Sequence, residues 1–413
     1  MRLRPPRAEG PSETPTRLDR WSRRAVTAVF FVQGFFFASW TAHIPHLQHH
    51  LNLSDARLGL ALLGAPVGSV LAIAVAGRLL AKLGSQRMVR IALVGYCVVG
   101  PFLGLTDLIG TFFVVFLLWG FFLGMLDVSM NTQAIAVERI SGRVLMPGFH
   151  GSWSTGSLAG ALTGAVAVGL GISLSSQLLV LAIPCLLIVG WLTTSLIADQ
   201  PSESDAAPTE GRPGKRGGVF QGAVIVLGAV AFADMLCEGA VADWGAVYLR
   251  NSLHVVPLVA GMGYAAYSFA MLSVRLFGNL IFTRYTAHQV LPLVAGVASV
   301  GFAGGLLINQ PFSVLLGFAL LGAGLGCVVP MIFSIAGTVE NVDTGRSVAA
   351  VSGFGWAGFV VGPVVIGEVA SVTTLHIALF LIPALAGIVA VATGMTKTLR
   401  RSTVVEPANP VAG

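Results

Sequence analysis

The chain has 413 residues, of which 55% are hydrophobic and only 10% are charged, and its net charge is +6. Soluble domains carry about a quarter charged residues, so this composition excludes a protein whose surface is mainly aqueous. It also excludes a disordered chain, which needs low hydrophobicity. The basic residues form no patch interleaved with aromatic residues, so the expected partner is the lipid bilayer and not nucleic acid.

Residues 1–24 form a polar, Arg-rich N-terminal tail. The apolar run that follows is long and has no small-residue cleavage site, which indicates a retained membrane span and not a signal peptide. A spanning helix needs about 20 apolar residues. Runs of this kind predict an all-α integral membrane protein of twelve transmembrane helices, at residues 25–47, 57–81, 88–106, 110–138, 148–171, 177–197, 219–249, 256–282, 288–308, 312–338, 347–371 and 374–397.

One long connection interrupts this series. Residues 198–218 are rich in Pro, Ser, Gly and charge, which is typical of a linker. We expect this linker to separate two six-helix bundles, at residues 25–197 and 219–397, with a C-terminal tail at residues 398–413.

The basic residues predict the orientation. If the N-terminus is cytoplasmic, nearly all Arg and Lys residues between spans fall on the cytoplasmic side, and the outer loops hold only Arg57 and Arg250. We therefore expect a multi-pass protein of a bacterial inner membrane, with both termini and the linker in the cytoplasm.

The two halves resemble each other. An offset of about 202 residues pairs glycines in corresponding spans, such as Gly120 with Gly322 and Gly156 with Gly358. Matches at a near-constant offset indicate an internal repeat, and therefore two pseudo-symmetric bundles.

Small residues spaced by four, here Gly156 and Gly160 in one span and Gly358 and Gly362 in another, allow helix backbones to approach closely. Helix packing alone would explain them. We also expect these smooth faces to let one bundle move against the other.

Polar groups inside the spans carry the strongest functional signal, because a charge at mid-helix costs about 2.5–3.5 kcal/mol on insertion scales. Asp127 lies near the middle of its span with Asn131 one turn away, and Asp234 and Glu238 repeat that spacing. No Lys lies inside the spans, and the deepest basic residue is Arg275. A carboxyl without a partner can bind and release a proton, so Asp127, Glu238 and Asp234 are predicted to couple transport to H⁺. The alternative is that each acid bonds a neighbouring hydroxyl or amide.

Other polar and aromatic residues suit the binding of a solute. His150 opens a span beside Trp153, while Trp40 and Trp244 could form aromatic walls for a ring or could simply pack in the core. His43 is expected at a cavity mouth; Pro45 disturbs the histidine spacing around it, so no metal is predicted, and no cofactor is either. The predicted substrate-binding residues are Gln33, Trp40, His43, Asn131, His150, Trp153 and Trp244.

The loop at residues 77–87, GRLLAKLGSQR, resembles the Gly-x-x-x-Asp-Arg/Lys-x-Gly-x-Arg-Arg/Lys signature of the major facilitator superfamily. Gly77, Lys82, Gly84 and Arg87 match, while Ala81 replaces the Asp. The resemblance implies the two-bundle fold of that family and a conformational role for the matching residues. The missing acid implies that the usual charge-gated latch is altered.

The string LDVSMN at residues 126–131 resembles the Leu-Glu-x-x-x-Asn of the fucose–proton symporter branch, in which the acid is implicated in proton coupling. That branch carries a second acid in the first span, where this chain has Thr41 or Ala42. The resemblance therefore implies that Glu238 or Asp234 supplies the second carboxyl.

Together these patterns predict a monomeric secondary transporter that moves a small polar, possibly sugar-like solute by proton symport. A drug–proton antiporter of the same fold and a non-transporting membrane sensor are the alternatives. The motifs HExxH and GxSxG and a phosphate-binding loop are absent from the sequence, so neither an enzyme nor an ATP-driven pump is predicted.

Overall fold

The computed structural model describes residues 17–143, 145–198, 222–282, 285–337, 339, 342 and 344–395. Every regular element in these ranges is helical. The predicted tails and the 198–218 linker lie outside them, apart from residues 17–24 and 198.

The first half contains six helical passes, several of them broken by a kink. In chain order they are α1 (Arg17–Ser39) with η1 (Thr41–His43) and α2 (Ile44–His50), α3 (Asp55–Leu62) with α4 (Gly64–Leu83), α5 (Ser85–Val99) with η2 (Gly100–Leu105), α6 (Ile109–Ser141), α7 (Met146–Gly169), and α8 (Leu174–Pro184) with η3 (Cys185–Val189), α9 (Gly190–Leu192) and η4 (Thr193–Ser195).

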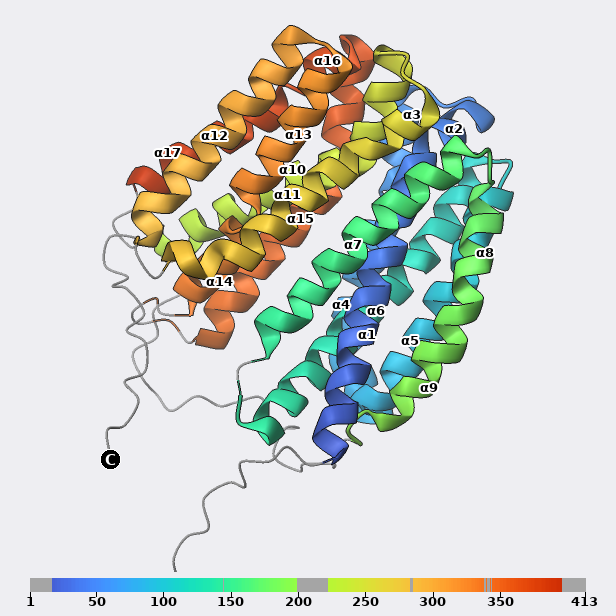
Figure 1. Ribbon diagram of the computed structural model, residues 1–413, viewed down its shortest axis with the longest axis vertical. Coiled ribbons are helices and arrows are strands. Elements are labelled where there is room, and N and C mark those ends of the chain that lie inside the picture. The colour runs from blue at the N-terminus through green and yellow to red at the C-terminus, as the bar shows by residue number, and fades with distance from the viewer. Residues whose placement is uncertain are drawn as a thin grey trace, which may run out of the picture.

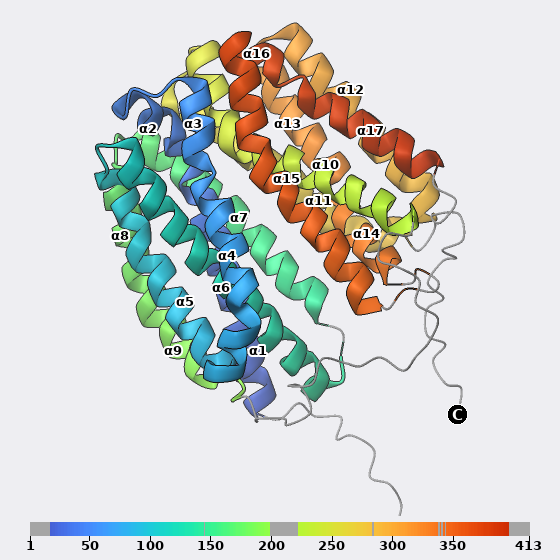
Figure 2. The same ribbon diagram turned by 180° about the vertical axis from the view of Figure 1, so that it is seen from behind.

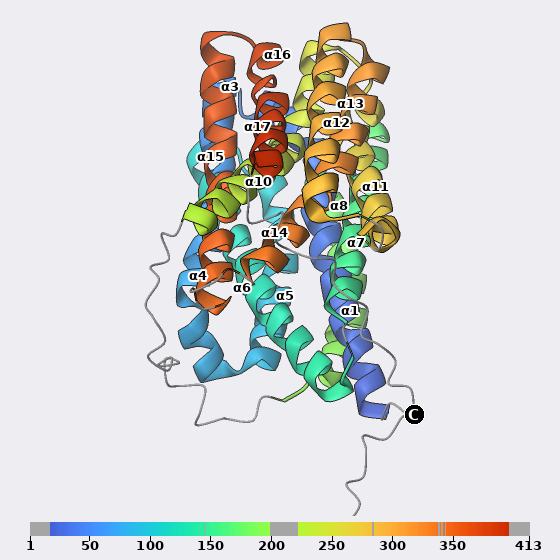
Figure 3. The same cartoon turned by 90° about the vertical axis from the view of Figure 1, so that its left-hand side faces the viewer.

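The second half repeats this organisation. Its passes are α10 (Gly222–Val247) with η5 (Tyr248–Ser252), α11 (Pro257–Phe282), α12 (Ala287–Ile308), α13 (Pro311–Leu325) with α14 (Val328–Ala336), α15 (Thr344–Val372), and α16 (Leu375–Ala378) with α17 (Leu381–Met395). Figure 1 shows the two halves as separate bundles lying side by side, blue to green for the first and yellow to red for the second. A side view shows that most helices of both bundles run up or down the molecule (Figure 3).

Eleven helical segments among the described residues are long and apolar enough to cross a membrane. α7 is less apolar because Gly and Ser occupy much of it, but its 24 residues span about 36 Å at 1.5 Å per residue, and it runs within the first bundle (Figure 1). With α7 included, the prediction of twelve transmembrane helices is confirmed.

Short turns between passes use residues that tolerate positive φ. Gly84, with φ of 74°, joins α4 directly to α5, and Gly142, with φ of 62°, ends α6. Asn309 takes the same left-handed conformation as Gly142, after α12, at φ of 54°. Glycine has no Cβ to clash there, and Asn is among the residues that adopt it most readily.

The internal repeat is visible in helix packing. Gly120 of α6 lies against the backbone of Ala65 in α4, and Gly322 of α13 lies against the backbone of Tyr267 in α11. Both members of the second pair lie 202 residues after their counterparts, and the next turn of the same helices repeats the pairing. The predicted two-fold relationship is confirmed by equivalent contacts in both bundles.

The other glycine pairs pack inside the bundles and not between them. Gly156 and Gly160 of α7 face the backbone of α1, at Phe31 and Phe35, and Gly358 of α15 faces Phe232 of α10. Gly362 lies beside α10 as well. The expectation that these faces move against the opposite bundle is therefore corrected: they hold neighbouring helices of one bundle together, as the helix-packing alternative stated.

This position predicts a folding defect for Gly160→Leu. A side chain at Gly160 would collide with the carbonyl oxygen of Phe35, and overpacking of this kind costs about 1–3 kcal/mol or more. We expect a lower melting temperature and a lower yield of monodisperse protein. Gly151→Leu, on the same helix but with no atom within 4 Å of a new Cβ, is the control and should retain wild-type stability. Normal stability of Gly160→Leu would contradict the packing assignment.

Candidate functional site

The first polar cluster lies in the first bundle, on α6 and α1. The Asn131 side chain donates to the backbone oxygen of Asp127 at 2.8 Å and to its carboxylate Oδ1 at 3.4 Å. Gln33 of α1 donates to the Leu123 backbone oxygen at 3.3 Å and also offers a hydrogen bond to the Asp127 carboxyl. No Arg, Lys or His among the described residues forms an ion pair with Asp127, and its hydrogen-bond partners are the amides of Asn131 and Gln33.

The second cluster lies in the second bundle. Asp234 and Glu238 are one turn apart on α10, and both interact electrostatically with Arg275 of α11. Asp234 is almost fully buried, and its Oδ1 has no hydrogen-bond partner among the described residues. The guanidinium does not reach ion-pair distance of either acid in the described part of the chain.

Arg275 instead connects the two bundles. Its Nε donates to the Gly326 backbone oxygen at 2.8 Å, within its own bundle, and its Nη1 donates to Ser154 Oγ of α7 at 2.8 Å. His150, one turn before Ser154, interacts electrostatically with Arg275 and packs its ring against Phe30 with the centroids 5.3 Å apart. The predicted residues His150 and Arg275 therefore lie near each other, although 125 positions separate them.

Aromatic side chains from both bundles meet beside these clusters. Phe37 of α1 lies between Trp153 of α7, at 6.2 Å between ring centroids, and Tyr264 of α11, at 6.3 Å. The Tyr264 hydroxyl lies next to Ser157 and within electrostatic range of Glu238. Trp153 was predicted from the sequence, but Tyr264 and Ser157 were not. A hydroxyl-bearing ring in an apolar span was the available signal for Tyr264.

Three predicted binding residues lie elsewhere. Trp40 packs on Phe116 at 4.7 Å between centroids and is 2% exposed, and Trp244 is fully buried. Both positions fit the core-packing alternative and not an aromatic wall. His43 is buried, and its Nε2 lies 2.6 Å from Gln177 Oε1 of α8. It therefore links two segments of the first bundle, and it also lines a small pocket together with His46 and His50, so its role as a polar group at a cavity mouth stays a prediction.

The loop that resembles the family signature forms the α4–α5 turn. Lys82 and Arg87 are exposed, and no described carboxylate pairs with them; Gly77 has open space where a Cβ would lie. Behind this turn, Gln133 of α6 donates to Ser85 at 2.7 Å and to the Ile197 backbone oxygen at 2.8 Å. Gln133, a polar residue two positions beyond Asn131, was not predicted from the sequence. Its bonds tie α5 and α6 to the end of the sixth pass.

At the end of the molecule formed by α2, α3 and η5, which we call the α2 end, side chains join the bundles. Asn251 of η5 donates to Gln48 Oε1 of α2 at 2.9 Å, and Asn251 Oδ1 lies 3.2 Å from His49 Nε2. Gln48 also donates to Asp55 Oδ1 at 2.8 Å. None of these residues was predicted from the sequence; Asn251 lies about 200 positions from Gln48 and His49, so no local pattern connects them.

Backbones of the two bundles also approach closely at the α2 end. A Cβ at Gly59 of α3 would lie 2.5 Å from the carbonyl oxygen of Pro363 in α15, and one at Gly367 would lie 2.7 Å from the Asp55 oxygen. Figure 2 shows α3 and α15 adjacent there. On the other side, Gly261 of α11 approaches Ala165 of α7 in the same way, at 2.7 Å. These contacts hold the bundles together at the α2 end.

Comparison with known proteins agrees with this architecture. Residues 25–336 match the family described as Major Facilitator Superfamily. An uncharacterised MFS-type transporter of Yersinia pestis is 33% identical over 84% of this chain and 89% of its own length. The membrane protein MosC of Rhizobium meliloti is 32% identical over 94% of this chain and 95% of its own length.

Solved structures share the fold at low sequence identity. The nucleoside transporter NupG aligns with a TM-score of 0.72 at 14% identity, covering 90% of this chain and 98% of NupG. A D-xylose–proton symporter aligns with a TM-score of 0.70 at 14% identity, covering 90% of this chain and 97% of the symporter.

Proposed function

Because the chain belongs to the major facilitator superfamily, we propose that it moves a small polar, sugar-like solute in symport with protons, by alternating access between the two bundles. The observation that carries the proposal is the pair of carboxyl clusters, Asp127 on the first bundle and Asp234 with Glu238 on the second. A carboxylate without an ion-pair partner is costly in a bilayer, so such acids are retained where they carry protons or bind a substrate.

The residues around these acids suit a neutral, hydroxylated solute. The amides of Asn131 and Gln33 can donate and accept, and the rings of Trp153 and Tyr264 can stack on an apolar ring face. Arg275 donates once within its own bundle, to Gly326, and once across the bundles, to Ser154, so its release from Ser154 would accompany separation of α11 from α7. In this scheme Asp127 and Glu238 take up and release the coupled proton. The hydrogen bond from Arg275 to Ser154 forms when α11 and α7 are together and breaks when they separate.

A solute screen tests the proposal. Purified protein is heated with candidate sugars and related polar compounds, because a ligand at 100 times its Kd stabilises the folded state by about 2.7 kcal/mol. A stabilising solute is then assayed in proteoliposomes with and without an inward proton gradient. Gradient-driven accumulation supports symport. Expulsion of solute against the proton flow would indicate the antiporter, and stabilisation without any flux would indicate a sensor.

We also propose that the end where α1 begins faces the cytoplasm of a bacterial cell. Arg20, Arg23 and Arg24 of α1 and Arg139 of α6 lie towards this end, together with Lys82. The α2 end carries two arginines, Arg57 and Arg250, beside the acids Asp55 and Asp107. Positive charge concentrates on the cytoplasmic side of inner-membrane proteins, so this distribution supports cytoplasmic termini.

Site-directed labelling tests the orientation. In a variant lacking the four native cysteines, a cysteine at Ser204 should react only after the membrane is permeabilised, because the linker is expected inside. A cysteine at Asn309, which is exposed in the turn between α12 and α13, should react with an impermeant reagent on intact cells. Reaction of both positions from the same side would contradict the twelve-span topology.

A further inference from the structure

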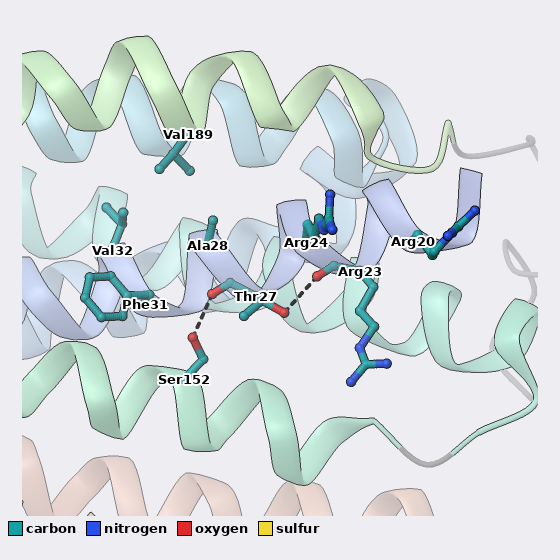
Figure 4. Close-up of a pocket in the computed structure, with 9 residues that line it drawn as sticks. All are labelled: Arg20, Arg23, Arg24, Thr27, Ala28, Phe31, Val32, Ser152 and Val189. Atoms are coloured by element: carbon teal, nitrogen blue, oxygen red, sulfur yellow. Dashed lines mark hydrogen bonds between the residues drawn. The ribbon is translucent and has the colours of Figure 1, made fainter. Parts of the chain in front are cut away.

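A groove runs along the side of the first bundle, on α1 between α7 and the sixth pass (Figure 4). Its volume is about 570 Å³. Three arginines, Arg20, Arg23 and Arg24, lie at one end, and Phe31 and Val189 are among the apolar residues that line the rest. We call it the α1 groove. It is basic at the end where α1 begins and apolar further along.

The polar atoms inside the α1 groove are already bonded. Ser152 of α7 donates to the Thr27 backbone oxygen at 2.9 Å, and Thr27 donates to the Arg23 backbone oxygen at 2.8 Å, as the dashed lines in Figure 4 show. The guanidinium groups are the donors that remain, since no carboxylate among the described side chains pairs with them. Arg24 also lies over the Trp21 ring, 5.0 Å from its centroid.

The groove faces the lipid and not the polar clusters. Gln33 follows Arg24 by nine residues, which is two and a half turns of helix, so the two side chains point to opposite sides of α1. Beside the groove, Leu187, Ile188 and Trp191 are 69%, 60% and 62% exposed. Such a run of exposed apolar side chains on a membrane protein contacts acyl chains, and Trp191 pairs with Trp21 at 5.8 Å between centroids, as aromatic residues do at membrane interfaces.

We infer that the α1 groove binds an anionic phospholipid, with its phosphate among Arg20, Arg23 and Arg24 and one acyl chain along Ala28, Phe31 and Val32. Basic pockets between helices at a membrane interface bind the phosphates of anionic headgroups. The distance from Arg24 to Val32 along α1 is about 12 Å, which lets the first part of an acyl chain lie in the groove while the phosphate stays at the interface. A water-soluble anion would bind the arginines without contacting the apolar residues of the groove. A phospholipid would contact both, so the combination of basic and apolar residues favours a lipid.

Lipid titration of the purified full chain in neutral detergent tests the inference. Phosphatidylglycerol should raise the melting temperature, and phosphatidylcholine should do so far less. Each Arg near an anionic surface strengthens binding roughly fivefold, so the double variant Arg23→Gln/Arg24→Gln should bind phosphatidylglycerol roughly 20- to 30-fold more weakly. Ala28→Phe, which fills the apolar part without changing charge, should also weaken binding.

The matched control is Arg139→Gln/Arg143→Gln. It removes the same charge near the same end of the bundle, from exposed positions of α6 and the residues after it, and it should leave the lipid effect intact. Equal losses in both double variants would show a diffuse charge effect and would overturn the site. Stabilisation by inorganic phosphate alone would assign the arginines to a free anion. If Ala28→Phe leaves the lipid effect unchanged, the acyl chain does not lie in the groove.

Discussion

Asp127→Asn should abolish uphill accumulation of the solute while leaving exchange down its gradient measurable. Asn has the shape of a protonated Asp and no charge, so the variant can complete the conformational cycle but cannot carry a proton. The amides of Asn131 and Gln33 that surround position 127 can bond an Asn as well as an Asp. The fold should therefore be unaffected. The measurement is uptake driven by a pH gradient beside counterflow in proteoliposomes.

The control is Asp107→Asn. Asp107 is an exposed acid at the α2 end that contacts only His50, at 3.1 Å, among the described residues, and its loss should leave coupling unchanged. Full accumulation by Asp127→Asn would show that coupling resides elsewhere, and Asp127 would then be a structural partner of Asn131. Glu238→Gln should match Asp127→Asn if the second bundle supplies the other carboxyl.

Gly59→Leu should block transport by preventing closure of the α2 end. A Cβ at this position would lie 2.5 Å from the Pro363 carbonyl oxygen of the opposite bundle, so a Leu cannot fit while α3 and α15 are in contact. Overpacking costs about 1–3 kcal/mol, which shifts an equilibrium between two conformations roughly 5- to 150-fold. Because the contact joins two bundles and not helices of one, the variant should still fold. Spin-label distances between α3 and α15 should increase while the melting temperature stays near wild type.

Gly110→Leu is the matched control for this variant. It lies at the start of α6 near the same end, and a Cβ there meets nothing within 4 Å. Transport by Gly110→Leu should be normal. If Gly59→Leu transports at the wild-type rate, the contact between α3 and α15 does not have to close during the cycle.

Much of this fold follows from local sequence patterns. A bilayer requires each pass to be an apolar helix of about 20 residues, so the spans could be placed within a few residues, α7 included. The exception is the first helix, which begins at Arg17, eight residues before the predicted start and inside the predicted N-terminal tail. The 202-residue offset could be detected in the sequence because the helix packing is repeated. Gly120 lies against the backbone of Ala65, and Gly322 lies against the backbone of Tyr267, which is also 202 residues later in the chain. The glycine periodicity thus predicted close packing correctly.

The sequence by itself determined which residues are costly to place in a membrane: Asp127, Asp234, Glu238 and Arg275 are polar wherever they lie. Only the tertiary structure decided what each meets, because contacts between helices join residues far apart in the chain. It placed Gly160 against α1 and Gly59 against α15, although both are glycines on apolar helices. It joined Arg275 to Ser154 across 121 positions. The composition of a helix determines whether it lies in lipid or in water. The rotation of each helix about its own axis determines which neighbouring residues it contacts, and the spacing of residues in the sequence does not fix that rotation.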